Sequence, residues 1–258
     1  MRDDLNGTGK RCLRIAAAGD LHCSEQHREQ IQEAFAGLQG MADVVLLAGD
    51  LTTHGEPEQG AVLAEACAVL DGIPVFAVLG NHDWHADRAG ELVGVLQEGG
   101  IRVLDRGWAV CEAAGLELGI VGVKGFVGGF PGSHLPDFGE PLLRGIYRET
   151  SLEIEALDRG LREIALCPTR IVLLHYAPTC ETIVGEPHGI WAFLGTDRLA
   201  APIAEHEPDL VLHGHAHAGT FEGAIGNVPV YNVSVPVIAR DFWLFELDVP
   251  TPAHAPIH

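Results

Sequence analysis

The chain has 258 residues, of which 47% are hydrophobic and 20% are charged, close to ordinary globular usage. This composition excludes a disordered or fibrous protein, and the length is sufficient for one large α/β domain or two small ones. The formal net charge of -20, with 16 lysines and arginines, argues against stable binding to nucleic acid or anionic membranes, because phosphate contacts require a surplus of basic side chains.

The sequence favours a cytoplasmic protein without a membrane partner. No apolar run approaches the ~20 residues that a membrane helix requires, and residues 44–48, the best run, are the size of a strand. The polar segment 1–11 contains no hydrophobic targeting sequence. The six cysteines are widely spaced and form no Cys-x-x-Cys pair, which argues against a thiolate zinc site and predicts reduced thiols.

The first hundred residues alternate short apolar runs with longer amphipathic ones, a pattern typical of repeated βαβ units. The predicted strands cover residues 13–18, 44–48 and 74–79, with starts about 30 residues apart, the length of one βαβ repeat. A helix is predicted after each of these strands. The spacing of Ile31, Phe35 and Leu38 indicates the first helix, and the other two cover residues 57–70 and 89–98.

Residues 102–118 and 120–123 favour further strands, joined by a turn at Ala114-Gly115. Residues 125–144 are dense in Gly and Pro without periodicity and are predicted to form a long ordered loop. Such a loop can shape the mouth of a pocket, and a packed surface excursion is an equally good interpretation. The candidate phosphate or substrate contacts in or beside this loop are Lys124, His134 and Arg144.

The remainder of the chain is predicted to contain two helices and several strands. Thr150 with Glu153 forms a capping box and predicts a helix start there. The other predicted elements are strands 171–174 and 210–212, a helix over 196–206 despite Pro202, and antiparallel strands 228–235 and 242–248 that close a second sheet. We identify no repeat or linker, so residues 1–258 are predicted to form a single domain with a loop insertion at 125–144.

Polar side chains follow five of the predicted strand ends. In open α/β sheets the carboxyl ends of strands converge on one crevice, which brings groups distant in sequence together. Oxygen ligands from Asp and Asn with nitrogen from His suit Mn, Fe, Zn, Ni or Co, and two metals ~3.5–4 Å apart would use all of them. The motifs are Asp20-x-His22, Gly49-Asp50, Gly80-Asn81-His82-Asp83, His175 and Gly214-His215-x-His217.

In this order the five motifs resemble those of the calcineurin-like metallophosphoesterases. The resemblance implies an α/β fold, a four-layer αββα sandwich of two mixed β-sheets flanked by helices, known as the metallo-dependent phosphatase fold. It also implies two divalent or trivalent metal ions, with Mn or Fe favoured, bridged by Asp50. The other ligands implied are Asp20, His22 and His217 for the first metal and Asn81, His175 and His215 for the second.

The resemblance further implies a metal-dependent phosphoric ester hydrolase. A water shared by two cations can have its pKa lowered to ~7, and the resulting hydroxide would attack phosphorus in line. His82 matches the family's metal-free motif histidine and is expected to protonate the leaving oxygen, with Asp83 holding His82 in position. The expected substrate is a small-molecule phosphodiester, a phosphomonoester or a nucleotide, since the acidity disfavours polymeric DNA.

Two alternatives are a phosphoprotein phosphatase and a catalytically inactive metal-binding scaffold. A single Asp-x-His or Gly-Asp after a strand is usually a turn or helix cap, so the prediction depends on the motifs occurring together. The intact Asn81-His82-Asp83 argues against a scaffold. His213 lies outside the pattern and is expected to be hydrogen-bonded. Surface or loop positions are expected for His54, His85, His134 and His188.

Overall fold

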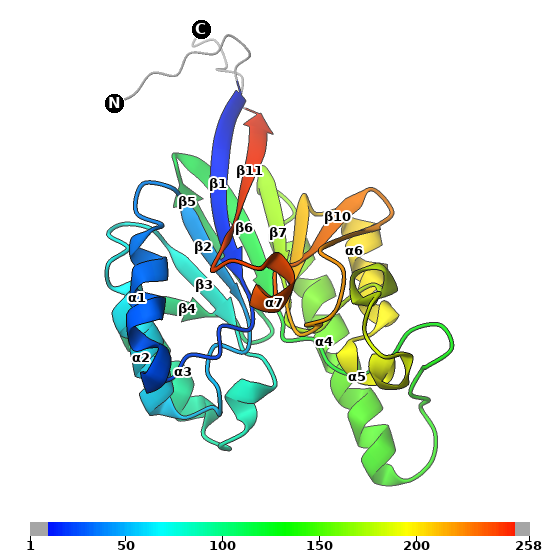
Figure 1. Cartoon of the computed structure of the whole chain (residues 1–258). Coiled ribbons are helices and arrows are strands. Elements are labelled where there is room, and N and C mark those ends of the chain that lie inside the picture. The colour runs from blue at the N-terminus through cyan, green and yellow to red at the C-terminus, as the bar shows by residue number, and fades with distance from the viewer. Residues whose placement is uncertain (1–9, 251–258) are drawn as a thin grey trace, which may run out of the picture.

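Two mixed β-sheets form the centre of the protein, as a computed structural model of residues 10–250 describes it (Figure 1). The first nine residues, part of the polar segment noted above, lie outside the described residues. The first sheet contains, in spatial order, β11 (Trp243–Pro250), β1 (Lys10–Ala18), β2 (Val44–Ala48), β3 (Val75–Val78) and β4 (Ile101–Val103). Strands β1 to β4 run parallel, whereas β11 pairs antiparallel with β1.

The second sheet contains, in spatial order, β5 (Gly107–Ala113), β6 (Leu116–Gly122), β7 (Thr169–Leu173), β8 (Leu210–His213), β10 (Val228–Asn232) and β9 (Glu222–Ile225). Its four inner strands run parallel, and the two edge strands β5 and β9 are antiparallel to their neighbours. Every residue of β2 and β3 is buried, as expected for parallel strands that are covered on both faces.

Helices cover the outer face of each sheet (Figure 1). The first sheet is covered by α1 (Arg28–Ala36), α2 (Pro57–Cys67) and α3 (Ala89–Glu98), and the second by α4 (Pro141–Glu163) and α6 (Ala200–His206). A core of buried side chains between the sheets, including Ile15, Phe76 and Ile171, joins the two halves. The predicted four-layer αββα sandwich is therefore confirmed.

Short helices occupy the connections between these elements. They are α5 (Trp191–Leu194), α7 (Val235–Ile238) and 3-10 helices at Glu25–His27, His82–Trp84, Cys180–Ile183, His188–Ile190 and Asp197–Leu199. Within residues 10–250, no helix combines the length and apolar character that crossing a lipid bilayer demands.

Two strand predictions were wrong. Residues 102–118 are not one strand, because β4 ends at Val103 in the first sheet and β5 begins at Gly107 in the second. Arg106 lies between them with a φ of 50°, so the chain turns sharply as it crosses from one sheet to the other. The C-terminal strands do not close the second sheet as antiparallel partners: β10 is parallel to β8, and β11 joins the first sheet. Local alternation predicts a strand but contains no information about its partner.

The start of α4 was also predicted wrongly. The helix begins at Pro141, not at Thr150, so the irregular loop ends at residue 140 rather than 144. The first turns of α4 expose their apolar residues, with Leu142 79% exposed, and therefore lack the periodicity that marks a buried helix face. Thr150 and Glu153 do not cap the helix: the Thr150 hydroxyl donates to the Val127 carbonyl at 2.6 Å, which fastens the loop to the helix.

Candidate metal centre

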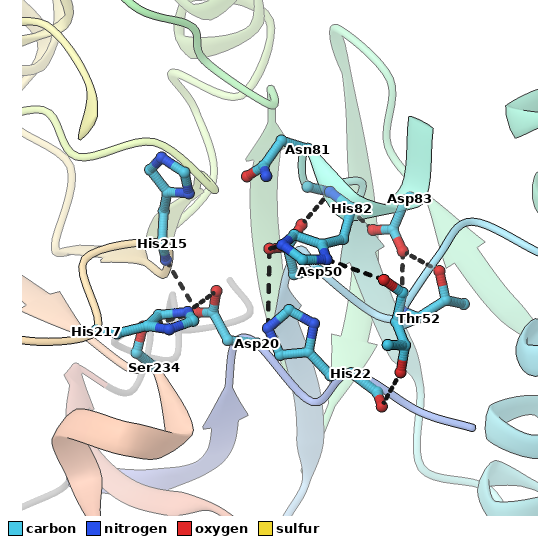
Figure 2. A network of polar contacts seen from close by, with 12 residues as sticks. Asp20, His22, Asp50, Thr52, Asn81, His82, Asp83, His215, His217 and Ser234 are labelled. Carbon is cyan, nitrogen blue, oxygen red and sulfur yellow. Dashed lines mark hydrogen bonds and ion pairs between the residues drawn. The ribbon is translucent and has the colours of Figure 1, made fainter. Parts of the chain in front are cut away.

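The carboxyl ends of strands from both sheets bring all seven predicted ligands to one place, and Figure 2 labels each of them except His175. The ligand atoms of Asp20, His22 and His217 lie within 4.8 Å of one another, and so do those of Asp50, His175 and His215. The seventh side chain, Asn81, has its Oδ1 2.9 Å from His175 Nε2, in the second group. These are the two ligand sets that the motifs imply.

Three donors hold the carboxylate of Asp20, which belongs to the first group. Its Oδ1 lies 2.9 Å from His217 Nε2, and its Oδ2 accepts from the Ser234 hydroxyl at 2.7 Å and from the His215 backbone N–H at 2.9 Å. Burial raises the pKa of Asp20, but the hydrogen bonds from His217 and Ser234 and the electrostatic influence of the His175 and His217 imidazoles together hold that pKa well below its ordinary value. Asp20 is therefore anionic at neutral pH and suited to hold a cation.

Asp50 lies between the two groups and is 1% exposed. Its Oδ2 is 4.0 Å from His22 Nε2 in the first group, and its Oδ1 is 3.5 Å from His175 Nε2 in the second. The backbone N–H of His82 donates to Oδ1 at 2.7 Å and fixes the carboxylate in this orientation. A single carboxylate that faces both groups is suited to bridging two cations.

The imidazoles of the second group each direct one nitrogen to a backbone carbonyl. His175 Nδ1 donates to the Ala48 carbonyl at 2.9 Å, and His215 Nε2 donates to the Phe193 carbonyl at 3.1 Å. The other nitrogen of each ring is thereby left with its lone pair, the arrangement that metal-binding histidines use. Burial lowers the pKa of His215 to about 3, so this ring is neutral at physiological pH and can act as a ligand.

Four of the proposed ligand residues have strained backbones. Asp20, His22, Asp50 and His215 have φ values of 59°, 45°, 49° and 71°, in the left-handed region that non-glycine residues seldom adopt. Such conformations cost ~1–3 kcal/mol each and are concentrated at functional sites. The fold thus maintains an unfavourable backbone where side chains must turn toward a common point.

The motif glycines are explained by close approach to the same side chains. A Cβ atom on Gly80 would lie 2.1 Å from Asp50 Oδ1, and one on Gly214 would lie 2.5 Å from Asp20 Oδ2. A Cβ on Gly49 would be 2.5 Å from His175 Nδ1. None of these gaps admits a methyl group, so glycine is needed at each position for the ligands to reach their places.

We therefore expect Gly80→Ala to disturb the metal centre through Asp50. The added methyl group should lower the free energy of unfolding by ~1–3 kcal/mol and weaken Mn²⁺ binding roughly 10- to 100-fold, because Asp50 must move. Thermal denaturation and calorimetric titration with Mn²⁺ measure the two effects. The matched control is Gly94→Ala in α3, where a Cβ meets no atom within 4 Å, and native Mn²⁺ affinity in Gly80→Ala would contradict the expectation.

The donor set and its charges fit two cations. Two buried carboxylates, Asp20 and Asp50, are surrounded by imidazoles, and within residues 10–250 no lysine or arginine forms an ion pair with either of them. Buried carboxylates without a permanent counter-charge are costly, and bound cations would supply it. Mixed oxygen and imidazole donors suit first-row transition metals.

His82 lies beside the two groups without belonging to the predicted ligand sets. Its Nδ1 donates to the Thr53 carbonyl at 2.9 Å, and its Nε2 lies 3.9 Å from Asp50 Oδ2. The ring is also 4.6 Å from that of His22, measured between centroids. His82 is partly exposed, so its Nε2 edge is available to a substrate at the centre.

The expectation that Asp83 holds the His82 ring is corrected by these contacts, since the ring is held by Thr53. Asp83 is fully buried and binds the neighbouring loop: its carboxylate accepts from the backbone N–H groups of Leu51, Thr52 and Gly80 and from the Thr52 hydroxyl. Burial raises the pKa of Asp83 to about 6, and the four donors keep the carboxylate ionised at neutral pH. Asp83 therefore positions the backbone around Asp50 and Asn81.

The other five histidines considered in the sequence analysis lie outside the two groups. His213 is buried and hydrogen-bonded, with Nε2 2.8 Å from the Thr182 hydroxyl and Nδ1 2.8 Å from the Gly214 carbonyl, as expected. The expected surface or loop positions are observed for His54, His85, His134 and His188, all of which are exposed. His134 pairs with Asp197 at 2.8 Å, away from the metal centre.

Sequence reasoning missed Ser234 and Thr53, which hold Asp20 and His82 respectively. Ser234 is a polar residue at the end of a predicted strand, so the rule that identified the ligands could have selected it. Thr53 contributes a backbone carbonyl, for which no side-chain signal exists. Arg144, the candidate substrate contact in the loop, is exposed and lies 3.6 Å from Asp137.

Comparison with known proteins gives one family match and several similar folds. The model of the calcineurin-like phosphoesterase family matches residues 13–219. A phosphopantetheinyl hydrolase from Mycobacterium tuberculosis is 16% identical, with a TM-score of 0.61 over 94% of this chain and 98% of that chain. No curated protein sequence matches the chain.

Two further solved structures share the fold. A putative 5'-nucleotidase from Staphylococcus aureus is 13% identical, with a TM-score of 0.56 over 96% of this chain and 56% of that chain. A purple acid phosphatase from yellow lupin (Lupinus luteus) seeds is 13% identical, with a TM-score of 0.52 over 96% of this chain and 46% of that chain. At these identities the likeness concerns the fold alone.

Proposed function

Because the chain belongs to the calcineurin-like phosphoesterase family, we propose that it hydrolyses phosphate esters at a centre of two metal ions. The observation that supports this most directly is the position of Asp50, whose carboxylate faces His22 on one side and His175 on the other. In this proposal Asp50 bridges the metals. The remaining ligands are Asp20, His22 and His217 for one ion and Asn81, His175 and His215 for the other.

Two bound cations, with Mn or Fe favoured, would neutralise charge on the phosphoryl oxygens and acidify a water molecule for attack on phosphorus. The protein's own residues set the geometry around them. Ser234 and His217 orient Asp20, and the His82 backbone N–H orients Asp50. Asp83 holds the loop that carries Asp50 close to Gly80.

His82 is the proposed general acid. Its Nδ1 is engaged by the Thr53 carbonyl, so in the protonated ring the Nε2 proton is the one free to move to a leaving oxygen. Asp50 Oδ2 lies 3.9 Å from this nitrogen and is too distant to compete by a hydrogen bond. The ring is thus fixed at one nitrogen and available at the other.

We propose a small-molecule phosphodiester or phosphomonoester, or a nucleotide, as the substrate. The net charge of -20 disfavours polymeric nucleic acid and acidic phosphoproteins. The putative 5'-nucleotidase that shares the fold is named for a nucleotide substrate, which supports the same choice. A phosphoprotein phosphatase and an inactive scaffold are the alternatives.

A turnover screen with defined metal content tests this function. The protein stripped with a chelator should be inactive, and reconstitution with Mn²⁺ or Fe²⁺ should restore hydrolysis of bis-p-nitrophenyl phosphate with two metals bound per chain. The rate with this ester should exceed that with a phosphopeptide at least about tenfold, a difference of about 1.4 kcal/mol in transition-state binding. A preference for the phosphopeptide would favour the phosphatase alternative, and no turnover by the metal-loaded protein would favour the scaffold.

A further inference from the structure

A cavity of about 270 Å³ opens beside Asn81 and is lined by side chains that the metal centre does not use. It lies next to the second ligand group, since Asn81 contacts His175. A volume near the lower end of small-molecule sites, which begin at roughly 300 Å³, admits a ring system rather than a polymer. The other residues that line it are Trp84, Lys124, Phe126, Glu149 and Tyr176.

Lys124 is placed by the same rule that places the metal ligands. It follows the end of β6, and its carbonyl accepts from the backbone N–H groups of His175 at 3.1 Å and Tyr176 at 3.0 Å. Strand β6 thus contributes a cation to the same edge of the sheet where its neighbour β7 contributes a metal ligand. It is one of only two lysines in the chain, whose basic residues are otherwise arginines.

The ammonium group of Lys124 lies over aromatic rings instead of pairing with a carboxylate. Nζ is 4.2 Å from the centroid of Phe126 and 5.3 Å from that of Tyr176. In the part of the chain that the structure describes, no hydrogen bond or ion pair of this ammonium group is found. A partly buried cation with no carboxylate in contact retains donor capacity for a ligand in the cavity.

Glu149 supplies an acceptor on the wall of the same cavity. Its side chain is 43% exposed and binds Arg106, which also donates to Glu153 at 2.7 Å. The cavity therefore combines the cationic donor of Lys124, the carboxylate acceptor of Glu149 and three aromatic side chains, of which the Phe126 and Tyr176 rings meet edge to face with centroids 5.8 Å apart. This combination matches a flat ring that has both donors and acceptors on its edge.

A second cavity, of about 390 Å³, shares Asn81 and Tyr176 but has a different character. Apart from His215 of the metal centre, its other walls are Val127, Ile190, Phe193 and Leu194. These side chains offer no donor or acceptor to the edge of a ring. The pair of charged side chains, Lys124 and Glu149, is therefore specific to the first of these two cavities.

We propose that the cavity around Lys124 binds a planar heteroaromatic group of the substrate, such as a nucleobase, and that Lys124 and Phe126 determine this specificity. The inference rests on the proposed function, because the cavity adjoins Asn81 of the metal centre. The ring stacks against Phe126, Trp84 or Tyr176. Lys124 donates to a ring nitrogen or carbonyl, and Glu149 accepts from a ring N–H or amino group.

Kinetics with matched substrates test the proposal. The Mn²⁺-loaded enzyme is given adenosine 5'-monophosphate and ribose 5-phosphate, and the methyl diester of each, which differ only in the base. We expect kcat/KM to be roughly 10- to 100-fold higher with the base, the range that base stacking on aromatic side chains provides. Lys124→Met and Phe126→Ala should move this ratio toward one, and Lys124→Arg should restore part of it.

Matched control variants are Arg159→Met and Phe138→Ala, both at exposed positions that do not line the cavity. They should leave the ratio at its native value. A native ratio near one, or a ratio that Lys124→Met and Phe126→Ala leave unchanged, would overturn the proposal. Hydrolysis of bis-p-nitrophenyl phosphate alone, with neither nucleotide nor ribose ester turned over, would overturn it as well while leaving the phosphoesterase function intact.

Binding of adenosine separates this inference from the proposed function. Adenosine has no phosphate, so its binding does not depend on turnover. Trp84 lines the cavity, and we expect adenosine to quench tryptophan fluorescence, with a Kd at least about tenfold weaker in Lys124→Met and Phe126→Ala. Adenosine binding without hydrolysis of any phosphate ester would contradict the phosphoesterase function and support the cavity assignment. Absence of adenosine binding would contradict the cavity assignment.

Discussion

Asp50→Ala is expected to reduce kcat by at least about 1,000-fold and to lower the metal content below two ions per chain. The proposed centre depends on this carboxylate more than on any other group, because it faces both ligand sets. Losing a bridge removes several kcal/mol of charge stabilisation, and each 1.36 kcal/mol corresponds to a factor of ten in rate. Elemental analysis together with turnover of bis-p-nitrophenyl phosphate measures both effects.

The control for this variant is Asp71→Asn, since Asp71 is an exposed aspartate after α2. It should retain two metals and native turnover. Asp50→Asn preserves the shape of the side chain and removes its charge. It therefore provides the test if the alanine variant does not fold. Two bound metals and near-native turnover in both Asp50 variants would contradict a bridging role.

His82→Ala is expected to reduce kcat roughly 100- to 10,000-fold, the usual contribution of a general acid or base, while both metals stay bound. The reason is the position of the ring, which is fixed to the Thr53 carbonyl and presents Nε2 to the centre without belonging to either proposed ligand set. A fall in kcat with no fall in metal content would identify His82 as a general acid rather than a metal ligand. Single-turnover kinetics and elemental analysis of the same preparation provide the comparison.

His188→Ala is the matched control, because His188 is exposed, its ring lies 4.6 Å from that of Trp191, and it belongs to neither ligand group. It should keep native kcat. Loss of one metal from His82→Ala would show that the His82 ring is a metal ligand. A native kcat in this variant would show that His82 takes no part in catalysis. A leaving group of low pKa should be less sensitive to the variant, since it needs no proton in order to depart.

The parts of the fold that short-range pattern determines could be predicted from the sequence. Strand β2 and helix α3 have the bounds that their apolar runs indicate, and the turn at Ala114-Gly115 joins β5 to β6 as expected. The partner of β11 could not be predicted, because an alternating segment fits the edge of either sheet. The first turns of α4 were missed because they project from the core and have no buried face to show a period.

The clustering of the candidate ligands could be predicted because these residues obey one geometric rule, that parallel strands end at a common edge. The rule places Asp50 and His175 together although 125 positions separate them in the sequence. In the structure, Asp50 Oδ1 and His175 Nε2 are 3.5 Å apart. What surrounds these residues could not be derived in this way. The contacts of Asp83 with Leu51 and of Thr53 with His82 depend on how two loops meet, which no periodicity encodes.

The pairing of β1 with β11 has a consequence for how the protein is made. Strand β1 leaves the ribosome early, yet eight of its residues find their antiparallel partners only when β11 has been synthesised. Until then the nascent chain exposes an unsatisfied strand edge, and Asp20 lacks the hydroxyl of Ser234 that holds it. Assembly of the candidate metal centre is thus coupled to the synthesis and pairing of β11.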